Sequence, residues 1–66
     1  MNIEIEREED GRWIAEVPHL PGVMAYGQSK EEAVSKVKAL ALRALADRLE
    51  RGEEIPKLRG VFAVPA

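Results

Sequence analysis

Residues 29–52 read SKEEAVSKVKALALRALADRLERG, and this stretch predicts a single long helix. Ser29 can cap the first turn, and Glu32 can complete a capping box by reaching back to the Ser29 amide. Gly52 suits a left-handed cap at the C-terminal end. A helix over residues 30–51 would be about 33 Å long, whereas strands of five or six residues span only about 20 Å. We therefore expect the helix to extend beyond any sheet that it covers.

The predicted helix carries two apolar stripes when successive residues are placed about 100° apart. The broader stripe, which should pack on a sheet, consists of Ala33, Val34, Val37, Leu40, Ala41 and Ala44. A second stripe of Leu42, Leu45 and Leu49 is rotated away from the first and lies in the overhanging half. Two interpretations stay open. In the first, the helix curves and Leu45 and Leu49 complete the core. In the second, the stripe contacts another subunit or a partner protein.

The N-terminal part of the chain predicts a β-hairpin. Residues 2–8 alternate apolar and acidic side chains, which is the period of a strand with one buried face. The acidic side carries Glu4, Glu6 and Glu8. Asp10-Gly11 favours a tight turn into a second strand over residues 12–17. The side chains of that strand that should face the core are Trp13, Ala15 and Val17. Ile14 and Glu16 then lie on the opposite face.

Turn residues separate the hairpin from a third strand. Pro18 has no amide donor and should end the second strand. Leu20-Pro21-Gly22-Val23 predicts a type II turn, because proline presets the second position and glycine accepts the positive φ of the third. Residues 23–26 are short and apolar, so we expect a third strand antiparallel to the second, with Gly27 at its end.

A final apolar run, Val61–Val64, predicts a fourth, edge-type strand between Gly60 and Pro65. The resulting order, β-β-β-α-β, indicates a single α+β domain over residues 1–66. In such a domain one long helix covers one face of an antiparallel sheet. Ile14 would then lie on the face that the helix cannot cover, and an isoleucine there suggests docking by another chain.

Length and composition favour self-association. A chain of 66 residues hides only about 60% of its unfolded surface, and this one has no cysteine to add disulfides. We therefore expect a homo-oligomer, either a dimer or a tetramer. No apolar stretch approaches the about 20 residues that span a bilayer, and the acidic N-terminus is unlike a signal peptide, which predicts a cytoplasmic protein. The charged composition, poor in amides, suits a thermophile.

The sequence offers little catalytic chemistry. It contains no phosphate-binding loop, CxxC or HExxH motif, and we expect no cofactor or bound metal. His19 lies in a turn and is interpreted as an exposed residue; the alternative is a general base or a pH-sensitive contact. The strand glutamates, with Glu16 beside them, could hold Mg²⁺ in a weak metal-dependent nuclease. Acidic residues that alternate along a strand more often form its solvated face.

The chain resembles the HicB-like antitoxin family, one half of the HicA–HicB toxin–antitoxin pairs. The resemblance runs in order through nearly the whole chain. The matching residues are Asp10-Gly11, the run WIAEVP at 13–18, Leu20-Pro21-Gly22, Gly27, Ser29, Glu31-Glu32-Ala33 and the run GEEIP at 52–56. Each short motif is ordinary turn or cap chemistry by itself, and the ordered set carries the resemblance.

The resemblance implies a partial ribonuclease-H-like fold without that fold's catalytic carboxylates. It also implies a non-catalytic oligomer that neutralises a small, basic HicA-like ribonuclease toxin. An acidic surface made of Glu4, Glu6, Glu8 and Glu16 would suit such a partner, because it imitates the RNA backbone. Family antitoxins commonly carry a C-terminal DNA-binding segment. These 66 residues contain none, so we expect no direct DNA binding, and a stand-alone oligomer without a toxin stays open. His19 stands where the family often has an acidic residue.

Overall fold

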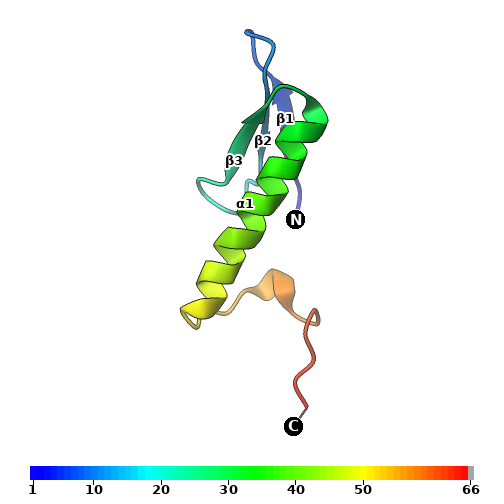
Figure 1. The fold of residues 1–66 in the computed structure, drawn as a ribbon. Coiled ribbons are helices and arrows are strands. Elements are labelled where there is room, and N and C mark those ends of the chain that lie inside the picture. Colours follow the sequence, from blue (N-terminus) through cyan, green and yellow to red (C-terminus); the bar gives the residue numbers. More distant parts are fainter. Residues whose placement is uncertain (66) are drawn as a thin grey trace.

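The structure, a computed structural model, describes residues 1–65 and consists of three strands followed by one long helix (Figure 1). Strands β1 (Glu4–Arg7), β2 (Trp13–Glu16) and β3 (Met24–Gly27) form an antiparallel sheet in chain order. Helix α1 (Lys30–Glu50) packs on β3 and β2, and a short 3-10 helix, η1 (Pro56–Leu58), follows it. The predicted α+β class, with one helix on one face of an antiparallel sheet, is confirmed.

The two predicted turns form as expected. In the β1–β2 hairpin the Gly11 amide donates to the Glu8 carbonyl at 3.0 Å, and the Glu8 amide donates to the Arg12 carbonyl at 2.7 Å. In the second turn the Val23 amide donates to the Leu20 carbonyl at 3.0 Å, while Gly22 has a φ of 83°. That positive φ is the reason for a glycine at the third position of a type II turn.

Ala15 lies at the centre of the sheet and of the core. It pairs with Ile5 of β1 on one side and with Ala25 of β3 on the other, and its side chain is fully buried beneath α1. The other buried apolar residues are Val17, Leu20, Val23, Ala33, Val37, Ala41, Leu45 and Ile55. Every helix residue in this group except Leu45 belongs to the broader stripe that the sequence predicted.

Gly27 allows the end of β3 to touch the first turn of α1. A Cβ atom at this position would lie 2.5 Å from the Ala33 amide nitrogen, which is closer than two such atoms can approach. Ala33 itself is completely buried. The backbone contact therefore requires glycine on the strand and a small residue on the helix, and it sets the distance between the two layers at this end.

Hydrogen bonds cap both ends of α1. The Ser29 hydroxyl accepts the Glu32 amide at 3.1 Å, as predicted, but the Glu32 carboxylate accepts the Gln28 amide at 2.9 Å rather than that of Ser29. The predicted capping box is thus displaced by one residue on its second bond. At the other end the Gly52 amide donates to the Leu49 carbonyl and the Glu53 amide to the Arg48 carbonyl. This pair of bonds is a Schellman motif with Gly52 at its left-handed position.

The predicted fourth strand at Val61–Val64 is wrong for the described residues, because the sheet has three strands and this run forms none. The reason is geometric. A helix of 21 residues is about 31 Å long, whereas strands of four residues span only about 13 Å. The chain therefore leaves the helix well beyond the sheet, and the final segment points away from it (Figure 1).

We predict that Gly27→Ala lowers the free energy of unfolding by about 1–3 kcal/mol, because the added methyl group overpacks the contact with Ala33. Urea denaturation at fixed protein concentration measures the change. Ser35→Ala, on the exposed side of α1, is the control and should change stability by at most about 0.5 kcal/mol. A Gly27→Ala protein as stable as this control would show that the two layers can separate freely.

A second prediction concerns acid stability. The Gln28 amide, followed by Lys36, lowers the pKa of Glu32 below its ordinary 4.5. The ionised carboxylate therefore stabilises the folded chain above pH 4.5, and this contribution is lost as pH falls through the lower folded pKa. Thermal unfolding of Glu32→Gln should show a lower Tm than the parent at pH 7. The difference should shrink in acid. A difference independent of pH would contradict this role for the charge.

Candidate protein-binding surfaces

The sheet face opposite α1 combines acidic and apolar side chains. Register places Glu4 opposite Glu16 and Glu6 opposite Ile14 across β1 and β2. Across β2 and β3 the same face continues as Ile14 opposite Tyr26 and Glu16 opposite Met24. No element of the described chain covers this face. We call it the open sheet face, and it consists of Glu4, Glu6, Glu8, Ile14, Glu16, Met24 and Tyr26.

Glutamates form the β1 side of the open sheet face. Glu4, Glu6, Glu8 and Glu16 line a shallow depression together with Ile14. Within residues 1–65 none of the four takes part in an ion pair; the acidic groups that do are Asp10, Glu32, Asp47, Glu53 and Glu54. The structure therefore brings together the four carboxylates that the sequence singled out and leaves their charge without a counterion from the chain.

Three apolar side chains form the β3 side of the open sheet face. Met24 and Tyr26 are 42% and 41% exposed, and Ile14 is half-buried between them and the glutamates. The Arg12 guanidinium lies 4.4 Å from the centre of the Tyr26 ring, a cation–π contact. The sequence analysis found Ile14 but missed Met24 and Tyr26. Alternation in the third strand was the available signal, since Val23 and Ala25 point to the core.

Arg12 is held in place by Asp10. The Asp10 carboxylate accepts the Arg12 backbone amide at 3.0 Å and its side-chain Nε at 2.7 Å. These bonds lower the pKa of Asp10, the backbone amide most strongly. The hairpin tip thus fixes one cation beside Tyr26 at the edge of an otherwise acidic face.

The overhanging half of α1 borders a second surface. Of the predicted stripe, Leu42 and Leu49 are 67% and 46% exposed, whereas Leu45 is only 4% exposed and packs in the core. Within the single chain Leu45 is therefore a core residue, as one of the two interpretations expected. Contact roles for Leu42 and Leu49 remain predictions.

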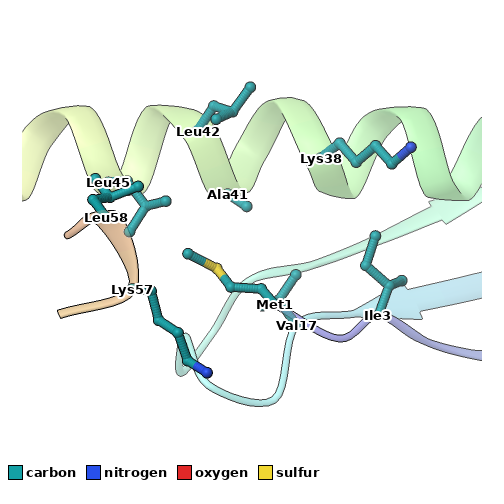
Figure 2. Close-up of a pocket in the computed structure, with 9 residues that line it drawn as sticks. All are labelled: Met1, Ile3, Val17, Lys38, Ala41, Leu42, Leu45, Lys57 and Leu58. Carbon is teal, nitrogen blue, oxygen red and sulfur yellow. The ribbon is translucent and has the colours of Figure 1, made fainter. Parts of the chain in front are cut away.

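An open apolar groove of about 450 Å³ runs beside this half of the helix. We call it the overhang groove, and its main walls are Met1, Ile3, Ala41, Leu42, Leu45 and Leu58. Met1 reaches from the N-terminus into the space between α1 and Lys57, and Leu58 of η1 lies near Leu45 (Figure 2). Lys38 and Lys57 are the charged residues at its rim, so the groove is mainly hydrophobic with a positive border.

Other residues that the sequence singled out have structural or solvent-exposed positions. His19 is exposed in its turn, as predicted, and Ser29 is a helix cap. Trp13 is half-buried against the core, with the Arg7 guanidinium 5.8 Å from the centre of its ring. Among the described residues, no three histidine, cysteine or acidic side chains come close enough to hold a metal ion. In the same residues no helix is long and apolar enough to cross a membrane.

Comparison with known proteins places the chain in a family. No protein-family profile matches it. A UPF0150 protein of Thermoplasma acidophilum is 39% identical over 54 residues, which are 80% of this chain and 77% of that protein. The chain belongs to the UPF0150 family. The resemblance of its motifs to the HicB-like family agrees in fold with a solved antitoxin domain.

The solved structures contain the same fold. The N-terminal domain of the antitoxin HicB of Burkholderia pseudomallei matches the present chain with a TM-score of 0.76. The match covers 97% of this chain and 69% of that one, at 19% sequence identity. At that identity the likeness establishes the shared architecture of three strands and one long helix.

The register of the open sheet face predicts that its glutamates lower the stability of the folded chain. Glu4 and Glu16 are direct cross-strand neighbours, and like charges in that position repel. Glu16→Lys should therefore raise the free energy of unfolding by about 0.5 kcal/mol at low salt, and the gain should diminish as salt is added. Glu9→Lys in the hairpin loop changes the net charge equally and is the control. An equal gain in both proteins would assign the effect to net charge alone.

Proposed function

We propose that this UPF0150 protein is a non-catalytic, cytoplasmic antitoxin of the HicB type that binds and blocks a small, basic ribonuclease of the HicA type. One observation carries the proposal. The open sheet face presents four glutamates without counterions beside an exposed apolar patch, and no part of the described chain covers it. In a chain without a partner, the like charges of such a face repel one another and its apolar side chains stay exposed to water. A cationic partner would offset the first effect and bury the apolar side chains.

Electrostatics favour an RNA-binding partner. A ribonuclease needs a basic surface to hold the phosphate backbone, and a row of carboxylates presents a similar series of negative charges. Charge complementarity of this kind accelerates association and selects the partner. The strands already hold Glu4, Glu6 and Glu16 on one face. Binding therefore has to restrict only the side-chain rotamers of these glutamates and not the backbone.

The apolar side of the same face supplies what charge alone cannot. Interfaces commonly consist of an apolar centre with a charged rim, and tyrosine and methionine are enriched there. Ile14 is flanked by Tyr26 on β3 and Glu6 on β1, so it lies where the two kinds of surface meet. We infer that Ile14 and Tyr26 become buried against the partner while the glutamates contact its basic groups.

A nuclease that uses the same glutamates is the competing function. Among the described residues no three histidine, cysteine or acidic side chains lie close enough to hold a metal ion, and this observation gives the nuclease alternative no support. Purified protein incubated with labelled RNA and Mg²⁺ or Mn²⁺ distinguishes the two. We expect intact RNA. Cleavage that disappears in Glu4→Gln/Glu6→Gln would favour the enzyme.

The decisive experiment begins with the reading frame beside this gene, which we expect to encode a small basic protein. We expect that protein to cleave RNA and to be inhibited by this chain in a one-to-one complex. Glu4→Lys/Glu16→Lys should weaken the complex by at least tenfold at low salt, because removing and reversing two interfacial charges costs several kcal/mol. Glu53→Lys/Glu54→Lys, two charges remote from the sheet, is the matched control and should bind like the parent. Equal binding by both double variants would refute the proposed face.

Self-association without a toxin is the second candidate function, and the overhang groove specifically favours it. A scaffold of this kind would need the groove and the exposed Leu42 and Leu49 but not the acidic face. Absence of any RNA-cleaving partner, together with a stable oligomer that tolerates Glu4→Lys/Glu16→Lys, would support this reading over the antitoxin.

A further inference from the structure

The single chain exposes more surface than a compact protein of its mass. Its accessible surface is 5132 Å² for 7.3 kDa. A compact monomer of that mass exposes about 4,200 Å², which leaves an excess of roughly 900 Å². The radius of gyration, 14.2 Å, likewise exceeds the roughly 11 Å expected for 66 residues. If each of two copies hid this excess, the interface would measure about 1,800 Å², which is a standard size for a stable complex.

The last described residues of the chain are strongly exposed. Val61, Phe62 and Val64 are 60%, 72% and 89% exposed, which is unusual for three large apolar side chains in one short run. The run Gly60–Pro65 contains no charged residue. Within the described residues the amides of Phe62, Ala63 and Val64 donate no hydrogen bond, although the Val61 amide donates to the Leu58 carbonyl. We call residues 61–64 the C-terminal segment.

The overhang groove provides the complementary surface. It is mainly apolar, and it extends beside the part of α1 that lies beyond the sheet. The four residues of the C-terminal segment span about 13 Å when extended, and the eight residues of α1 from Lys38 to Leu45, which border the groove, span about 12 Å. The segment and the groove therefore match in length as well as in polarity.

We propose that a second copy of this chain fills the overhang groove with its C-terminal segment, and that the exchange is reciprocal. This inference deepens the self-association proposed above by naming the segment and the groove that carry it. Phe62 is the anchor, because an aromatic side chain can bury about 150–250 Å². Leu42 and Leu45 of the receiving copy form the wall and floor against which it packs.

The direction of the chain favours a second copy over the chain's own segment. Leu58 and Lys57 line the groove, and the C-terminal segment starts three residues after Leu58 and runs away from α1 and the sheet (Figure 1). In each copy the C-terminal segment starts beside the groove that receives the segment of the other copy. A single two-fold axis can therefore place both segments in both grooves. Interfaces in which the same two elements meet twice are the usual form of a symmetric dimer.

The exchange also explains why Val61–Val64 reads as a strand but forms none in one chain. Valine and phenylalanine favour extended backbone, and an extended segment needs a neighbour for its hydrogen bonds and side chains. The length of α1 carries the segment out of reach of its own sheet. A partner copy supplies the neighbour that the single chain lacks.

Light scattering and native mass spectrometry of the full chain test the proposal. We expect the parent to have twice the mass of one chain, and Phe62→Glu/Val64→Glu and Leu42→Glu each to have the mass of one chain. All three positions are exposed, so circular dichroism should show an unchanged helix in each variant. Tyr26→Glu on the open sheet face is the control and should remain a dimer.

A cysteine pair tests the contact itself, since the chain has no cysteine of its own. Leu42→Cys and Phe62→Cys proteins are mixed and oxidised. A disulfide-linked dimer containing one of each, and much less product in either protein alone, would support the exchange. A single protein carrying both substitutions that links internally would overturn it in favour of a segment folded onto its own groove.

The outcomes separate this inference from the proposed function. A parent of single-chain mass would overturn both the exchange and self-association. A dimer that tolerates Phe62→Glu/Val64→Glu but is broken by Tyr26→Glu would overturn the exchange and place self-association on the open sheet face. Toxin binding is measured separately with the glutamate variants, so its failure would leave the exchange standing.

Discussion

The contact between Gly27 and Ala33 is the constraint on which the rest of the structure depends. It brings the end of β3 against the first turn of α1, at a distance that excludes even one additional methyl group. With the helix fixed to the sheet at its N-terminal end, the remaining turns continue in one direction past the short strands. Ala15, Ala33 and Val37, which are all fully buried, complete this close packing of helix on sheet.

Because α1 is longer than the strands and covers one face of the sheet only, this packing leaves two exposed surfaces. A single helix covers one face of the three-stranded sheet, and no element within residues 1–65 covers the other face. The same helix overhangs the sheet, and its far half forms a groove with the N-terminus and η1. The two surfaces differ in chemistry. The open sheet face is acidic with an apolar side, whereas the overhang groove is apolar with lysines at its rim. We propose a different partner for each surface, a cationic protein for the open sheet face and a second copy of the chain for the overhang groove.

Local chemistry made most of the fold predictable. Ser29 and Gly52 marked the ends of the helix, Asp10-Gly11 the hairpin and Pro21-Gly22 the type II turn, because each of these residues acts through its nearest backbone neighbours. Alternation along the first two strands also assigned Ile14 and the glutamates to one face.

The predictions that the structure does not match concern residues whose environment depends on where the chain lies in three dimensions. Val61–Val64 has the composition of a strand, but whether it pairs depends on how far α1 carries it from the sheet. Leu45 and Leu42 share a stripe in sequence, yet Leu45 belongs to the buried core cluster, which also contains Ile55, whereas Leu42 is exposed. Met24 and Tyr26 were missed because residues 23–26 form one apolar run, so their composition does not distinguish the two faces of this strand.

Hydrogen exchange at the amides of Phe62, Ala63 and Val64, followed over a range of protein concentration, tests most directly whether the chain is completed by a second copy. Exchange reports local opening, and an interface between copies is strengthened by mass action. We expect slow exchange of these amides in concentrated solution and fast exchange on dilution, while the amides of Ala15 and Val37 in the core keep most of their protection. Fast exchange of the C-terminal segment at every concentration would contradict the reciprocal exchange.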